Sequence, residues 1–157
     1  MITIVTGNIN SLKTTRLKAH YDARQLGDGF LCLKTMMNDL VHHYDLYRLS
    51  TKEQFPFIIR EDFYQNEKKI RYQMGPYLFY DQAFKRVEGS VEVMIKAGVS
   101  PIYLDEIGLL ELKNQGFHHI LMQLLHAAVD LCLVIRSDLL DKVIEKYQIE
   151  DYEIVGD

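Results

Sequence analysis

The fold is decided by the stretch Ile2-Thr3-Ile4-Val5-Thr6, which leads into Gly7-Asn8-Ile9-Asn10-Ser11-Leu12-Lys13-Thr14-Thr15. The first five residues have the length and β-branched content of a buried strand. Residues 7–14 match the phosphate-binding loop G-x-x-x-x-G-K-[ST] at every specified position except that of Leu12. Because this motif connects a strand to a helix, the stretch predicts a strand, a phosphate-binding loop and a helix over residues 13–25.

Each part of this loop has a distinct chemical role in the complete motif. Backbone N–H groups close around a phosphate at the helix N-terminus, where the helix dipole favours an anion. The lysine reaches the outer phosphates, which makes Lys13 a candidate catalytic residue, and the hydroxyl of Thr14 is a candidate Mg²⁺ ligand. The candidate nucleotide-binding residues are Gly7, Asn8, Ile9, Asn10, Ser11, Leu12, Lys13, Thr14 and Thr15.

Composition places the chain among ordinary globular proteins. Its 157 residues are 48% hydrophobic and 25% charged, with only 3 Pro and 9 Gly, so we expect a single domain over 1–157. The formal net charge of −4 argues against nucleic-acid binding, which needs a concentrated basic face. Cys32 and Cys132 lie in apolar runs without a C-x-x-C partner, which indicates buried reduced thiols. We find neither a signal peptide nor a membrane-length apolar stretch, and we expect a cytoplasmic protein with no membrane contact.

Strands and helices alternate along the rest of the sequence. Helical periodicity indicates helices over 81–98 and 113–128, and a further helix up to Tyr147 for which Ser137 is the expected N-cap. Short apolar runs predict strands over 101–104, 131–135 and 152–155, and two or three hairpin strands are expected among 30–33, 44–49, 57–59 and 70–74. The pattern predicts an α/β fold, in which a mainly parallel sheet has helices on both faces and a β-hairpin extension.

Two further places at the ends of predicted strands carry charged side chains. Asp105 and Glu106 follow the strand 101–104, where an aspartate can hold Mg²⁺ and a glutamate can take a proton from an attacking water. An acidic pair in this position also suits a helix N-terminal turn or a solvated loop. Arg136 follows the strand 131–135 and can stabilise charge on a transferring phosphate, or it can pair with Asp138 or Asp141.

The sequence resembles a known protein family over nearly its whole length. The segment Tyr103-Leu104-Asp105-Glu106-Ile107-Gly108-Leu109-Leu110-Glu111-Leu112 is similar to the Asp-Glu-Ile-Gly-x-Met-Glu-Leu signature of the small nucleoside-triphosphatases, which include the cancer-related human NTPase and its bacterial and archaeal homologues. Gly29-Phe30, the hairpin region and residues 131–137 stand where that family has its second strand, its hairpins and its late strand. The family's loops carry glycines where this chain has Asn10 and Leu12, and a histidine-containing stretch where this chain has residues 135–137.

The resemblance implies a RecA-like P-loop fold that binds ATP, GTP or another nucleoside triphosphate with Mg²⁺ and hydrolyses it to the diphosphate. It implies that the loop holds the phosphates and Lys13 bridges the outer ones. Thr14 and Asp105 would serve the metal, and Glu106 would orient the water. It gives Glu111 a supporting structural role.

Leu12 is the departure that bears on activity. A leucine at a position of positive φ is destabilised by about 1–2 kcal/mol and places a bulky side chain beside the β-phosphate. We therefore expect slow hydrolysis. One alternative is a nucleotide-binding regulatory protein without turnover, whose protein partner the sequence does not reveal. A small-molecule kinase shares the loop but normally needs an arginine-rich lid, and residues 107–130 contain no arginine.

Overall fold

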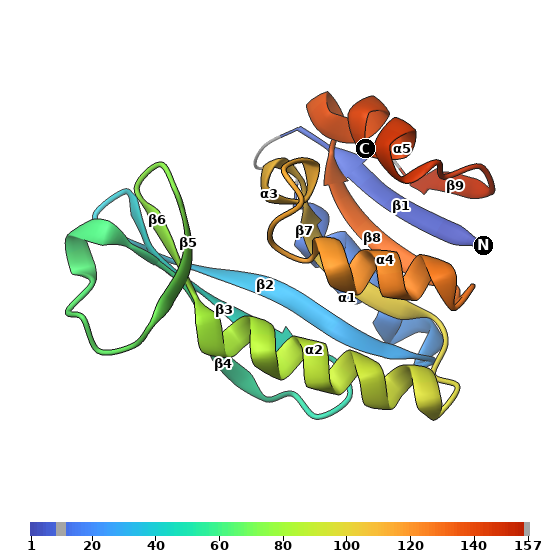
Figure 1. The fold of residues 1–157 in the computed structure, drawn as a ribbon, viewed down its shortest axis with the longest axis horizontal. Coiled ribbons are helices and arrows are strands. Elements are labelled where there is room, and N and C mark those ends of the chain that lie inside the picture. Colours follow the sequence, from blue (N-terminus) through green and yellow to red (C-terminus); the bar gives the residue numbers. More distant parts are fainter. Residues whose placement is uncertain (9–11, 156–157) are drawn as a thin grey trace.

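The computed structural model describes residues 1–8 and 12–155, and its strands form a nine-stranded sheet with the order β5-β6-β4-β3-β2-β7-β8-β1-β9 (Figure 1). Parallel pairing joins β1 to β8 and β9, and β7 to β8 and β2. The remaining neighbours are antiparallel hairpin strands that extend the sheet beyond β2. The strands are β1 (Ile2–Gly7), β2 (Asp28–Met37), β3 (Leu40–Arg48), β4 (Gln54–Arg60), β5 (Ile70–Met74), β6 (Tyr77–Tyr80), β7 (Ile102–Ile107), β8 (Leu131–Arg136) and β9 (Tyr152–Val155).

Helices cover both faces of the parallel part, as predicted. Alternate residues of β1 point to opposite faces, so Ile4 belongs to the larger core and Val5 to the smaller one. The smaller core receives Leu17 of α1 (Lys13–Arg24), whereas the larger core receives α2 (Asp81–Lys96), α4 (His118–His126) and α5 (Leu140–Tyr147) (Figure 1). Two short 3₁₀ turns, η1 (Glu61–Phe63) and η2 (Ser137–Leu139), and the one-turn helix α3 (Leu109–Leu112) complete the described elements.

The structure corrects the helix predicted over 113–128. A short helix α3 ends at Leu112, and α4 begins only at His118. Between them Gly116 has a φ of +64°, a conformation that a continuous right-handed helix does not contain. The periodic apolar face was correctly identified, because Ile120, Leu121 and Leu124 of α4 are buried.

Three other boundaries differ from the prediction. Asp105 and Glu106 lie inside β7 rather than after it. Ser137 begins the 3₁₀ turn η2, and Leu139 is the N-cap residue of α5, so the predicted capping role of Ser137 is wrong. The hairpin strands are longer and more numerous than predicted, with β6 as an additional strand. No helix of the described ranges 1–8 and 12–155 has the length and apolar character needed to cross a membrane.

Candidate active site

The candidate residues gather where β1, β8 and β7 end. These three strands are parallel neighbours, so their carboxyl ends lie at one edge of the sheet, where open α/β sheets bind ligands. Gly7 at the end of β1 pairs in register with Arg136 at the end of β8. The start of α1 and the acidic end of β7 therefore come together, as the sequence predicts.

The loop after β1 is closed by polar contacts on its described residues. Lys13 Nζ donates to the main-chain carbonyl of Asn8 at 2.6 Å, and Ser137 Oγ donates to Asn8 Oδ1 at 3.1 Å. Thr15 is exposed in the first turn of α1. The predicted binding residues Ile9, Asn10 and Ser11 lie outside the described residues.

Leu12 has the backbone conformation that a glycine adopts without strain. Its φ of 60° and ψ of 34° lie in the left-handed region, at the N-cap position of α1. Its side chain is 69% exposed and gains no packing in return. Leu12 therefore has the positive φ that was considered for this position from the sequence.

Asp105 joins the loop helix to the sheet. Its Oδ2 atom accepts hydrogen bonds from Thr14 Oγ1 at 2.6 Å and from the backbone N–H of Cys32 at 2.9 Å. Its Oδ1 atom is buried and has no hydrogen-bond partner among the described residues. Burial raises the pKa of this carboxyl to about 7, with a further contribution from Glu106, so the site favours a neutralising partner for the ionised form.

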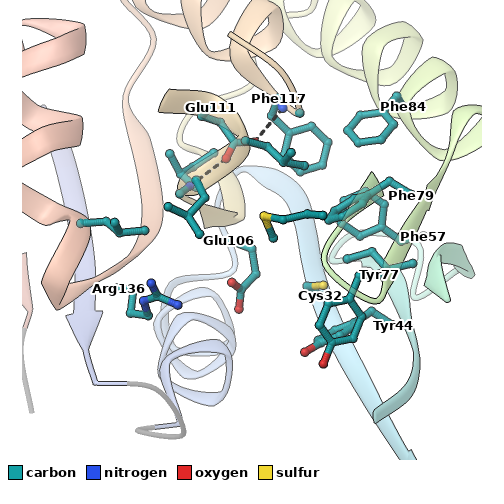
Figure 2. A pocket seen from close by; sticks show the side chains of 18 residues that line it. Cys32, Tyr44, Phe57, Tyr77, Phe79, Phe84, Glu106, Glu111, Phe117 and Arg136 are labelled. Atoms are coloured by element: carbon teal, nitrogen blue, oxygen red, sulfur yellow. Dashed lines mark hydrogen bonds between the residues drawn. The ribbon is translucent and has the colours of Figure 1, made fainter. Parts of the chain in front are cut away.

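Glu106 is held in an unusual backbone conformation. Its φ is +63°, and the pairing of β7 with β8 shifts register between Leu104 and Ile107. This irregularity sends its side chain toward Arg136 rather than into the core (Figure 2). Although Glu106 is exposed as a residue, the protein around its carboxylate displaces water, and this desolvation raises its pKa, against the opposing effect of Lys13 and Arg136.

Arg136 forms an ion pair with Asp138, which was one of the two roles that the sequence suggested for it. Its Nε and a terminal nitrogen donate to the two carboxylate oxygens of Asp138 at 2.5 and 3.0 Å. The guanidinium is still about a third exposed and lies beside Glu106 (Figure 2). The guanidinium of Arg136 therefore lies where it can act at the site. Its ion pair with Asp138 fixes the direction in which this guanidinium points.

Glu111 has a defined structural position behind the site. Its buried carboxylate accepts the backbone N–H groups of Gly108 at 2.7 Å and Phe117 at 2.8 Å (Figure 2). A Cβ atom at Gly116 would approach one carboxylate oxygen of Glu111 to 2.2 Å, so the carboxylate is enclosed by this turn. These bonds hold both ends of the segment that follows Glu106.

Sequence reasoning missed the residues that the hairpin strands bring to the site. The backbone N–H of Cys32 on β2 bonds Asp105, and Tyr44 on β3 and Tyr77 on β6 face Glu106 (Figure 2). These residues are far apart in sequence and belong to no motif. The one available signal was the tyrosine content of the hairpin region, which did not single out either residue.

The fold and the site together define the class of protein. A strand leads into a loop with a lysine and a threonine at a helix N-terminus, and an aspartate from a neighbouring strand contacts that threonine. This is the arrangement of a P-loop α/β protein.

Comparisons with known proteins give the family. The model of the family described as NTPase matches residues 2–156, so the chain belongs to the NTPase family. The solution structure of a human cancer-related nucleoside triphosphatase has a TM-score of 0.66 and 19% sequence identity, over 98% of this chain and 87% of that one. The crystal structure of THEP1 from the hyperthermophile Aquifex aeolicus has a TM-score of 0.68 and 17% identity, over 99% and 89%. No curated protein matches the chain.

Proposed function

We propose that this protein binds a nucleoside triphosphate together with Mg²⁺ and hydrolyses it slowly to the diphosphate and phosphate. The observation that carries the proposal is the 2.6 Å contact between Thr14 Oγ1 and Asp105 Oδ2, with Glu106 next along the same strand. Membership of the NTPase family and the name of the human structural neighbour, a nucleoside triphosphatase, support the same reaction class.

The oxygen atoms at this point suit Mg²⁺. Thr14 supplies a hydroxyl and Asp105 a carboxylate whose Oδ1 is buried and unpartnered within the described residues. Oxygen is the donor that Mg²⁺ prefers, and it typically uses one or two protein groups together with substrate phosphates. Thr14 and Asp105 would hold the ion, which when bound would neutralise negative charge on the phosphates.

The remaining candidates have complementary roles in the proposal. The loop 7–15 binds the phosphates through backbone N–H groups, and the Lys13 ammonium leaves Asn8 to bridge the outer phosphates. Glu106 orients the attacking water and accepts its proton, for which a pKa raised above that of an ordinary glutamate is favourable. Arg136 stabilises charge on the terminal phosphate.

We further propose that residues 1–157 form one NTPase domain, which acts in the cytoplasm without binding nucleic acid or membrane. The continuous nine-stranded sheet across the described residues supports the single domain, and the net charge of −4 argues against nucleic-acid binding. Leu12 supports slow rather than rapid turnover. It has a strained backbone conformation within the phosphate loop, and its bulky side chain lies in the same loop.

The first prediction tests the role of Glu106. Glu106→Gln should reduce phosphate release by about 100-fold or more, because removing a positioned general base removes an effect of that size. Binding of ATP with Mg²⁺ should persist. Phosphate release is measured under single-turnover conditions, and binding is measured by calorimetry with a non-hydrolysable ATP analogue.

Glu145→Gln is the matched control, because Glu145 is an exposed residue of α5 outside the site. It should hydrolyse ATP like the unaltered protein. Tight Mg²⁺-dependent binding with no phosphate release from any of the three proteins would instead identify a nucleotide-binding regulator. Equal, substantial release from all three would remove Glu106 from the mechanism.

A further inference from the structure

A cavity of about 230 Å³ lies beside Glu106 in the extended part of the sheet (Figure 2). Its walls come from β2, β3, β4, β5, β6 and α2, from the end of β7 and the segment that follows it, and from Arg136 of β8 and Leu139 of η2. In the strand order these hairpin strands lie on the side of β7 opposite to β8 and β1. The aromatic part of the cavity is therefore separated from the phosphate loop by β7, whereas Arg136 and Leu139 border the cavity on the β8 side.

The interior of the cavity is aromatic. Phe57 is central, with its ring centroid 5.5 Å from that of Phe117 in a stacked arrangement and 5.5 Å from that of Phe79 in an edge arrangement. Phe84 lies 5.4 Å from Phe57 and completes this wall. Such a surface favours a flat apolar group, and a cavity of about 150 Å³ is already sufficient to admit benzene.

The mouth of the cavity is polar. Figure 2 shows the Glu106 carboxylate between Arg136 on one side and the hydroxyl ends of Tyr44 and Tyr77 on the other. Neither tyrosine hydroxyl has a hydrogen-bond partner within residues 1–8 and 12–155, and the two rings meet edge to face at 6.1 Å. Arg136 is already paired with Asp138. The free groups are thus two hydroxyls and one carboxylate, which together suit a neutral hydroxyl group.

The location argues against a site for the nucleobase. In a P-loop site the lysine and the metal-binding hydroxyl serve the outer phosphates, so the terminal phosphate is the part of the nucleotide nearest to Glu106. The base is at the other end of the triphosphate. A cavity beyond Glu106 is therefore placed for a molecule that approaches the terminal phosphate from outside.

We propose that this cavity is a second-substrate site that takes a small aromatic alcohol and presents its hydroxyl to the terminal phosphate. The inference rests on the proposed binding of a nucleoside triphosphate. Because residues 107–130 contain no arginine for a kinase lid, Arg136 at the cavity mouth takes the role of stabilising charge on the transferred phosphate. The hydroxyl oxygen forms a bond to the terminal phosphorus while the bond from that phosphorus to the bridging oxygen breaks. The nucleoside diphosphate leaves, and the hydroxyl proton passes to the Glu106 carboxylate. Water takes the place of the alcohol when the cavity contains none, which gives hydrolysis.

Binding is tested on the full ¹⁵N-labelled chain with 2-phenylethanol as the probe. We expect saturable chemical-shift changes at the amides of Glu106, Ile107 and Gly108 and of β6. Met74→Trp places a larger side chain in the cavity from the partly exposed strand β5 and should weaken binding at least tenfold. Met122→Trp is the matched control, since Met122 is exposed on α4 and does not line the cavity.

The hydroxyl recognition is tested with a second pair of variants. Tyr77→Phe removes one mouth hydroxyl and should weaken binding of the probe several-fold. Tyr72→Phe makes the same change on β5 outside the cavity lining and should bind the probe unchanged. Circular dichroism of all four variants verifies that each is folded.

Transfer is tested by ³¹P NMR with ATP, Mg²⁺ and 2-phenylethanol. We expect 2-phenylethyl phosphate to form at the expense of inorganic phosphate. ATP hydrolysis without amide shifts, or shifts without a phosphorylated product, overturns the second-substrate site and leaves the proposed hydrolysis intact. Amide shifts in a protein that neither binds nor hydrolyses ATP contradict the proposed function and the transfer together.

Discussion

At the scale of single residues, substitution of Leu12 measures how far the altered phosphate loop limits nucleotide binding. Leu12→Gly removes a side chain from the phosphate loop and gives the φ of 60° to the residue that adopts it without strain. We expect nucleotide affinity to rise by about tenfold, which corresponds to roughly 1.4 kcal/mol. Calorimetric titration with a non-hydrolysable ATP analogue measures the change.

The other end of α1 provides the control for Leu12→Gly. Gln25 has a φ of 51° at the C-cap of the same helix, so Gln25→Gly relieves the same kind of strain away from the loop. Both variants should unfold within a few degrees of the unaltered protein, because glycine also raises the entropy of the unfolded chain. If Leu12→Gly changes neither affinity nor turnover, the loop holds phosphate in another way or holds none.

Asp105 gives the site a pH-dependent stability. A native pKa of about 7 against an ordinary value of 3.8 means that the folded state retains a proton that the unfolded state loses. The stabilising contribution is fully present below about pH 4 and is lost as the pH rises through about 7. The nucleotide-free protein should therefore lose this contribution between these limits.

The variant Asp105→Asn isolates this effect, because asparagine has a similar shape and does not ionise. The melting temperature of the variant minus that of the unaltered protein should be more positive at pH 8 than at pH 5, in metal-free buffer. Thermal unfolding at both pH values checks the sign. A difference that is independent of pH would show that Asp105 keeps an ordinary pKa.

At the scale of elements, the turn between α3 and α4 depends on one buried carboxylate. Glu111→Gln replaces one of the two acceptor oxygens, which hold Gly108 and Phe117, by an NH₂ donor. We expect a loss of about 1–3 kcal/mol in the free energy of unfolding, the usual effect of an unsatisfied buried group. Urea denaturation measures it, with the exposed Glu145→Gln as a control, and equal stability of both variants would contradict this reading.

The elements of the parallel half could be predicted from sequence, and the hairpin half only in part. Strands such as β8 are continuous apolar runs because both of their faces are buried. In β2 the buried residues end at Cys32, yet the strand continues to Met37 with exposed side chains, supported by pairing with β3. An apolar pattern therefore stops where the strand does not, and the predicted strand was too short.

The candidate site divides in the same way. The proximity of Thr14 and Asp105 follows from a motif and from strand ends, both of which are visible in sequence, whereas their roles stay predictions. The positive φ of Glu106 and the aromatic cavity could not be foreseen. They depend on a register shift between β7 and β8 and on strands β2 to β8, which tertiary pairing brings together.

At the scale of the whole molecule, the two faces of the sheet are covered unequally. Among the residues of α1, Leu17 alone is buried, whereas α2 buries Phe84, Val87, Val91 and Met94 among others. Because local opening is easier where little apolar surface is buried, amides of α1 should exchange with deuterium faster than those of α2. Mass-spectrometric hydrogen exchange checks this.

Nucleotide should reduce that difference. A ligand bound at the N-terminus of α1 stabilises the helix in proportion to its occupancy, so saturating ATP analogue and Mg²⁺ should slow exchange in α1 and leave α2 nearly unchanged. Equal protection of both helices without ligand, or slowing confined to α2, would contradict this account.

The single oxygen Asp105 Oδ2 is shared by the start of α1 and by β2, which also meet in the smaller core through Leu17 and Leu31. It accepts from Thr14 at the start of α1 and from the backbone of Cys32 in β2. A bound Mg²⁺ that takes the threonine hydroxyl would change what this carboxylate accepts on the α1 side, while the β2 backbone still donates to it. The nucleotide state of the loop would then reach the hairpin strands through this shared atom as well as through the packing of α1 on β2, without a hinge or a moving domain.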